Sequence, residues 1–264
     1  MSVRKCPSAN VRPQMSVRKC PSANVWTRKK TVVVQTTMTV TKNTDYQNTL
    51  FIGGSGLLNG ACDVKNTKLK NLMILTDGVT IENAIFDTPG YGIYCKGSCT
   101  LKNIYYKKLC YHAVGLAYTD TSKSYTYKVI GGAGQGSADK YFTQSGKGTT
   151  IIQNFCGEGK YGKLWCSCGN CGFQAKRSVE VYNTVMKGPG QSVVSVNLNY
   201  GDTVLFSGLT LYGQSSSSTA TKYACQNVNA LTYVAQLYAA SSFKPTESGT
   251  GSCTYKASSI KIAN

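Results

Sequence analysis

The sequence offers one imidazole and few carboxylates with which to do chemistry. The imidazole belongs to His112, which follows Tyr111 and could act as a base because histidine titrates near neutral pH. The preferred interpretation is that His112 is a packed residue of the fold's interior. The chain has 11 acidic residues and no two are neighbours, so no acidic pair is preassembled to hold a cation such as calcium. Folding could still bring two acids together.

Cysteine thiols are the second reactive group, and the chain has 12 of them. The run CSCGNC places three thiols at Cys166, Cys168 and Cys171, which could begin a zinc site. Zinc would ordinarily need a further Cys or His pair, and the chain has a single histidine. Disulfides are therefore favoured, with Cys156 as a candidate partner for Cys166. Paired cysteines in this number are typical of an extracellular protein.

The charge balance predicts an anionic partner. The formal net charge is +18, and the strongly basic surface should attract nucleic acid, acidic polysaccharide or an anionic membrane. Sequence motifs of RNP-like strands, zinc fingers and basic zippers are absent, which disfavours a specific nucleic-acid reader. No stretch approaches the roughly 18 apolar residues of a membrane-spanning helix.

A recurring apolar phrase that ends at Asn or Gly predicts the elements that must position these groups. Copies begin at Val79, Cys99, Thr149 and Ser178, and a further candidate begins at Tyr125. Each copy is short and rich in β-branched and aliphatic residues, which suits a strand followed by a turn. A sandwich would show more closely spaced strands with alternating polarity. The sequence therefore predicts an all-β parallel β-helix, a single disulfide-rich domain in which successive coils stack.

The two ends of the chain differ from this pattern. Residues 1–30 contain the same 11-residue segment twice, from Met1 and from Met15, and carry basic but no acidic residues. We expect a disordered basic tail there, with the β-helix domain over 31–264. An irregular C-terminal cap is expected from about 212, with a short helix around Val228 to Ala239 and ties at Cys225 and Cys253. No signal-peptide h-region is visible at the start.

Four motifs between Asp77 and Cys171 are more specific than the repeat. They are the run CKGSCTLKN from Cys95, ADK at 138–140, GKL at 162–164 and SCGNC from Ser167. Together they resemble the pectate lyases of polysaccharide lyase family 3, especially the cysteine-rich members from nematodes and fungi. The resemblance covers roughly 31–211. It implies a secreted, right-handed parallel β-helix that cleaves polygalacturonate by β-elimination with the help of calcium and basic side chains.

The resemblance implies catalytic roles for two lysines. One catalytic arginine of the family is replaced in this chain. The lysine of the family's Asp-Lys pair matches Lys140, and the lysine of its Gly-Lys-Leu run matches Lys163. The arginine that the family places three residues later is Cys166 here. A thiol cannot bind a carboxylate in the bidentate manner of a guanidinium.

The family's calcium positions are also substituted. Tyr91 replaces an aspartate, and Tyr111 and His112 replace an acidic pair. Lys108 occupies the position of another aspartate of the family, and Ala117 occupies the position of a lysine. We therefore expect no bound metal or other cofactor.

Three functions remain open at this stage. The first is a catalytically degenerate protein that binds pectate or a similar acidic polysaccharide. The second is an active lyase in which Lys96, Lys107 and Lys108 neutralise the substrate carboxylate and Lys140 or His112 takes the proton. We name Lys96, Lys107, Lys108 and His112 as substrate-binding candidates. The third is a structural solenoid that acts as a monomer or stacks end to end outside the cell.

Overall fold

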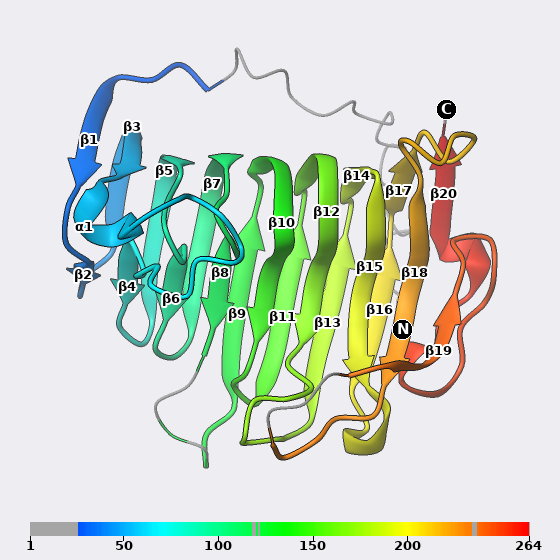
Figure 1. Ribbon diagram of the computed structural model, residues 1–264. Coiled ribbons are helices and arrows are strands. Elements are labelled where there is room, and N and C mark those ends of the chain that lie inside the picture. The colour runs from blue at the N-terminus through cyan, green and yellow to red at the C-terminus, as the bar shows by residue number, and fades with distance from the viewer. Residues whose placement is uncertain (1–25, 118–119, 121, 234–236, 264) are drawn as a thin grey trace, which may run out of the picture.

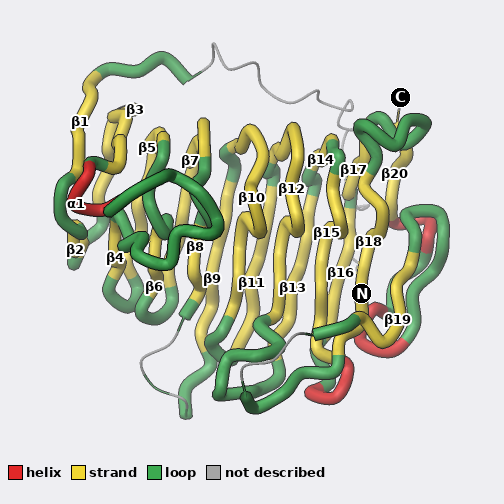
Figure 2. The backbone as a smooth tube through the Cα atoms, in the orientation of Figure 1, coloured by secondary structure: helices red, strands yellow, loops and turns green. Residues whose placement is uncertain are grey.

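The apolar phrases form consecutive strands of a right-handed parallel β-helix, as predicted (Figure 1). The computed structural model describes residues 26–117, 120, 122–233 and 237–263. Thr80 pairs with Thr100, and Thr149 pairs with both Thr126 and Ser178, so the copies at Val79, Cys99, Tyr125, Thr149 and Ser178 stack in parallel register. Figure 2 shows the strands joined by turns and by several longer loops.

Each coil visits three parallel sheets in turn. The first sheet contains β2 (Met38–Val40), β4 (Met73–Leu75), β6 (Ile93–Cys95), β8 (Val114–Leu116), the ends of β10 (Ala133–Gln144) and β12 (Cys156–Ser167), β15 (Gly190–Asn197) and β18 (Thr221–Val228). The second contains the starts of β3 (Thr44–Gly53), β5 (Val79–Asp87) and β7 (Cys99–Lys108), then β9 (Tyr125–Ile130), β11 (Gly148–Gln153), β13 (Arg177–Tyr182) and β16 (Thr203–Ser207).

The third sheet contains β1 (Lys30–Val34), the ends of β3, β5 and β7, the starts of β10 and β12, β14 (Val185–Lys187), β17 (Leu209–Tyr212) and β20 (Ile260–Ala263). The five long strands bend at a corner and so belong to two sheets. Helical structure in the described residues is limited to α1 (Ser55–Leu58) and the 3-10 turns η2 (Leu198–Tyr200), η3 (Gly251–Cys253) and η4 (Ala257–Ser259).

The corner between the second and third sheets explains why the phrase ends at Asn or Gly. Six successive coils place a residue with left-handed backbone there, namely Asn83, Asn103, Gly131, Asn154, Asn183 and Gly208. Asn and Gly adopt this conformation at lower cost than other residues. The side chains also stack, since the Asn103 Nδ2 lies 3.3 Å from the Asn83 Oδ1.

The core fills the inside of the coils with apolar side chains that stack from one coil to the next. Ring centroids of Phe51 and Phe86 are 5.6 Å apart, and those of Phe86 and Tyr106 are 6.1 Å apart. Phe142 continues the row, 6.3 Å from Tyr106. Stacked rungs of this kind bury each coil against its neighbours, which makes the solenoid one continuous core.

Four disulfides join described cysteines, and they confirm the disulfide interpretation of the cysteine count. The bonded pairs are Cys62–Cys110, Cys95–Cys99, Cys168–Cys171 and Cys225–Cys253. Cys166 is a free, buried thiol. The expected bond between Cys166 and Cys156 is therefore wrong.

The chain ends are more regular than the sequence indicated. Of the tail at 1–30, residues 1–25 lie outside the described residues, but the Trp26 ring stacks on Tyr105 at 5.5 Å and β1 begins at Lys30. Beyond 212, β18 continues the first sheet and β20 the third, so the segment is not simply an irregular cap. No helix occurs in the described part of 228–239, where β18 ends and β19 (Ala239–Phe243) begins.

β19 runs antiparallel to β18 and covers the last strand of the first sheet. This pairing leaves less free edge at the C-terminal end for a second molecule to stack upon. Within the described ranges, no helix has the length and apolar composition needed to cross a membrane.

Candidate functional site

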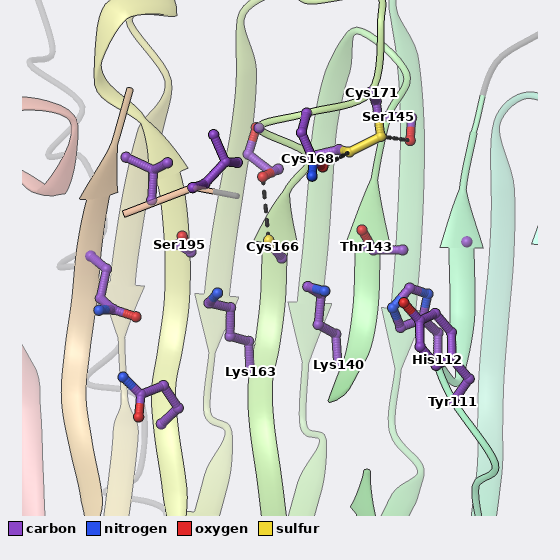
Figure 3. Close-up of a pocket in the computed structure, with 18 of the residues that line it drawn as sticks. Tyr111, His112, Lys140, Thr143, Ser145, Lys163, Cys166, Cys168, Cys171 and Ser195 are labelled. Atoms are coloured by element: carbon purple, nitrogen blue, oxygen red, sulfur yellow. Dashed lines mark hydrogen bonds between the residues drawn. A yellow bond between two sulfur atoms is a disulfide. The ribbon is translucent and has the colours of Figure 1, made fainter. Parts of the chain in front are cut away.

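A cavity of about 590 Å³ lies along the first sheet, beside the corner at which the chain arrives from the third sheet. Figure 3 shows its lining side chains on successive coils. The polar groups that dominate it are Tyr91, Tyr111, His112, Lys140, Thr143, Lys163, Cys166, Gln191, Ser195 and Gln226. A cavity of this volume suits a small ligand or a short stretch of a polymer.

Lys140 and Lys163 occupy paired positions on neighbouring strands of this cavity. They stand opposite each other in the β10–β12 register. Gly162 permits this close approach, because a Cβ there would lie 2.0 Å from the Asp139 carbonyl oxygen. The two side chains run side by side in Figure 3 toward the level of Cys166. Two cations held this way present a pair of docking points to an anionic ligand.

Asp139 connects the two neighbouring coils. Its Oδ2 lies 2.8 Å from the His112 Nε2 and also accepts a hydrogen bond from the Lys140 ammonium at 2.5 Å. Burial raises the pKa of the Asp139 carboxyl, but the hydrogen bond from His112 and the charge of Lys140 outweigh burial and hold this pKa well below its ordinary value. Asp139 therefore stays ionised at neutral pH.

The same contacts decide the protonation of the two partners. Burial lowers the pKa of Lys140, but the electrostatic interactions of its ammonium with the Cys166 sulfur and the Asp139 carboxylate overcome burial and raise this pKa above its ordinary value. For His112, burial outweighs the hydrogen bond to Asp139, so the pKa of the imidazole falls below its ordinary value. At neutral pH Lys140 is a cation, whereas His112 is neutral and donates its Nε2 proton to Asp139.

Three aromatic rings, tilted against one another, cluster beside the lysines. The ring centroids of Tyr111 and His112 are 4.0 Å apart, and those of Tyr91 and Tyr111 are 4.8 Å apart. Tyr91 remains 39% exposed, whereas His112 is only 6% exposed. The disulfide between Cys62 and Cys110 fixes the residue just before Tyr111. Aromatic faces of this kind pack well against the apolar face of a sugar ring.

The residues at the family's calcium positions do not fit calcium. Tyr91, Tyr111 and His112 offer phenol and imidazole groups, while calcium prefers several carboxylate or carbonyl oxygens. Asp139 is the nearby carboxylate, and it is already engaged by His112 and the Lys140 ammonium. Among the described residues, no group of three or more His, Cys, Asp or Glu side chains is arranged to hold a metal ion.

Three of the lysines named from the sequence lie away from the cavity. Lys96 is exposed in the turn after β6, and Lys107 and Lys108 are exposed at the end of β7. The Lys107 Nζ is 2.9 Å from the Asp87 Oδ2, which gives that ammonium a partner of its own. None of the three lines the cavity. Our candidate site therefore keeps Lys140, Lys163 and His112 and drops Lys96, Lys107 and Lys108.

The sequence analysis missed the part that Asp139 plays. The only signal was its place next to Lys140, because its second partner, His112, lies 27 residues earlier and is brought close by coil stacking. Cys166 was noted for the arginine it replaces, but its place in the row Thr143, Cys166, Ser195 and Gln226 depends on strand register.

The chain is similar in sequence to curated fungal proteins named as pectate lyases. Pectate lyase E of Emericella nidulans is 38% identical over 138 residues, which is 52% of this chain and 52% of that protein. "Probable pectate lyase E" of Aspergillus fumigatus is 39% identical over the same length and coverage. The chain thus spans about half the length of the curated relatives it matches.

Solved structures agree on the fold. The catalytic domain of pectate lyase PelI from Erwinia chrysanthemi superposes with a TM-score of 0.69 at 23% identity, over 89% of this chain and 100% of that chain. PelI in complex with tetragalacturonic acid gives a TM-score of 0.67 at 22% identity, over 87% of this chain and 70% of that chain. The family model described as pectate lyase matches residues 22–230. The chain therefore belongs to the pectate lyase family.

Proposed function

We propose that this protein binds an acidic oligosaccharide of the polygalacturonate type in the cavity, without calcium, and has little or no β-eliminating activity. The observation that carries the proposal is the pairing of Lys140 with Lys163 on adjacent strands. Their ammonium groups would each bind a uronate carboxylate, and charge-assisted contacts of this kind are among the stronger hydrogen bonds. Tyr91 and Tyr111 would support a pyranose ring.

Two arguments favour binding over catalysis. Elimination requires loss of the C5 proton beside a carboxylate, which is slow unless strong positive charge withdraws electrons from that carboxylate. Here Cys166 replaces the arginine that the family resemblance implies, and the donor set does not fit calcium. The complex of PelI with tetragalacturonic acid supports the choice of ligand class.

We also propose that the protein acts outside the cell. The four disulfides are the supporting observation, because such bonds persist in oxidising surroundings.

Lysine substitutions test the binding site. Lys163→Gln should weaken tetragalacturonate binding about tenfold or more, because it removes a charge-assisted contact worth roughly 1.5 to 3 kcal/mol. Lys107→Gln and Lys108→Gln carry the same charge change outside the cavity and should leave the affinity within about twofold. Isothermal titration calorimetry with each of the three variants measures these affinities. Equal weakening by all three variants would mean that binding follows net charge rather than this cavity.

A second candidate, a calcium-independent eliminase with His112 as the base, is favoured by one observation. The Nδ1 of His112 is buried and has no hydrogen-bond partner, while its Nε2 is held by Asp139. A neutral imidazole in this tautomer could accept a proton at Nδ1. If so, polygalacturonate incubated with chelator should yield unsaturated uronides, and His112→Gln should abolish them. Absence of product from the unsubstituted protein removes this candidate.

A further inference from the structure

The Cys166 thiol lines the cavity from β12, the strand that also carries Lys163. It follows Lys163 on β12, and its register partners are Thr143 on β10 and Ser195 on β15. Figure 3 shows the Lys140 and Lys163 side chains extending toward the level of Cys166 from either side. The side chain is 7% exposed and lines the cavity, where its Sγ contacts the Ser167 carbonyl oxygen at 3.3 Å.

Two further groups line the cavity together with the Cys166 thiol. The disulfide between Cys168 and Cys171 lines the same cavity, and the Cys171 Sγ lies 3.4 Å from the Ser145 Oγ. His112 also lines it, is 6% exposed, and has an Nδ1 without a hydrogen-bond partner.

We propose that Cys166 is a modification site that forms a mixed disulfide with a small disulfide carrying carboxylate groups. The Cys166 thiolate attacks one sulfur of the small disulfide, so that the Cys166–sulfur bond forms as the original S–S bond breaks. The second half leaves as a thiolate and takes up the proton that Cys166 released. Electrons and atoms balance without any other oxidant.

The lysines select the class of reagent. The two ammonium groups concentrate anionic reagents in the cavity. A disulfide with carboxylates can pair with Lys140 and Lys163 while its sulfur meets Cys166. A cationic disulfide would be repelled by the same two charges.

The site has a regulatory consequence that rests on the proposed function. An adduct on Cys166 would fill the space between Lys140 and Lys163 and occupy the ammonium groups assigned to the uronate carboxylates. Modification should therefore block tetragalacturonate binding, and reduction of the adduct should restore it. Bound tetragalacturonate should in turn slow the modification.

The experiment compares two reagents on the intact, oxidised protein. The dianionic disulfide 5,5′-dithiobis(2-nitrobenzoate) should react at least about tenfold faster, relative to each reagent's rate with a free model thiol, than the dicationic disulfide cystamine. Lys163→Gln should reduce this preference several-fold, whereas the matched variant Lys108→Gln should keep it. Cys166→Ser should release no stoichiometric leaving thiolate. Peptide mapping by mass spectrometry after acid quenching should place the adduct on Cys166.

Several results would overturn the inference. They are an equal or greater relative rate with cystamine, an adduct on Cys168 or Cys171, or undiminished reaction of Cys166→Ser. Mapping the unsubstituted protein gives an answer even if a variant fails to fold. The labelling rates need no oligosaccharide, so an unreactive Cys166 with intact tetragalacturonate binding refutes this inference alone. A reactive Cys166 without any tetragalacturonate binding refutes the proposed function alone.

Discussion

His112, Asp139 and Lys140 form a charge arrangement in which each group fixes the protonation of the next. The ionised Asp139 carboxylate accepts from both neighbours, which keeps Lys140 cationic and sets the imidazole tautomer. Lys140 is for that reason a poor general base at neutral pH, since the pKa of its ammonium is raised. The arrangement suits binding of an anion better than removal of a proton by lysine.

The single imidazole gives a direct test of this arrangement. Since the sequence contains one histidine, its ring resonances can be followed by NMR without assignment ambiguity. Burial lowers the pKa of His112, so the midpoint of its titration should fall below the ordinary histidine value of 6.5. Asp139→Ala should move the midpoint further down, because it removes the hydrogen bond that favours the imidazolium. A midpoint at or above 6.5 in the unsubstituted protein would contradict the buried, neutral assignment.

The same shift makes stability depend on pH. Because the folded-state pKa of His112 lies below its unfolded value, the unfolded chain binds this proton at higher pH than the folded chain does. The free energy of unfolding should therefore decrease as the pH falls below 6.5 toward 5. Urea unfolding at a series of pH values measures this slope, and His112→Gln should flatten it. An unchanged slope in that variant would place the effect elsewhere.

Among the secondary-structure elements, the arrangement of the strands depends on the corner between the second and third sheets. A residue with positive φ stands there in each of six coils, and the adjoining strands keep one register along the molecule. The corner therefore fixes where each strand restarts.

Asn154 tests the corner without touching the cavity. It is exposed and has a φ of 58°. Asn154→Ala should destabilise the protein by about 1 kcal/mol relative to Asn154→Gly, because a Cβ-bearing residue without a local polar group is strained in the left-handed region. Urea denaturation of the two variants measures the difference. Equal stabilities would show that the corner does not constrain the fold.

The sequence predicted strands more successfully than contacts. Apolar phrases ending at Asn or Gly located strands such as β5, β7 and β13, because strand propensity and turn chemistry are local properties. The helix expected around Val228 was wrong because pairing with β15 and β19 outweighs local propensity there.

Site residues were predictable only where a motif carried them. Lys140 and Lys163 were found through the family resemblance, and strand register then placed them opposite each other. Lys107 looked equivalent as a basic residue, but its outward position on β7 and its ion pair with Asp87 follow from the coil stacking. The contact between His112 and Asp139 likewise joins two coils, which no local pattern encodes.

At the scale of the whole molecule, the net charge of +18 adds a long-range attraction to the local pairing of the lysines. Raising the salt concentration from roughly 0.05 M to 0.5 M should weaken tetragalacturonate binding about tenfold or more, because the Debye length shortens to a few ångströms. Calorimetric titration at several salt concentrations gives the slope. An affinity that does not change with salt would show that the ligand is not held through its charge.

The central claim, that the cavity binds a uronate oligosaccharide through protein cations in place of calcium, is tested most directly by one titration. Tetragalacturonate is titrated calorimetrically into the protein in excess chelator and again in excess calcium, with Lys163→Gln measured in parallel. We predict affinities within about twofold between the two conditions, and at least about tenfold weaker binding by the variant in both. Binding that requires calcium, or that Lys163→Gln leaves unchanged, would contradict this account.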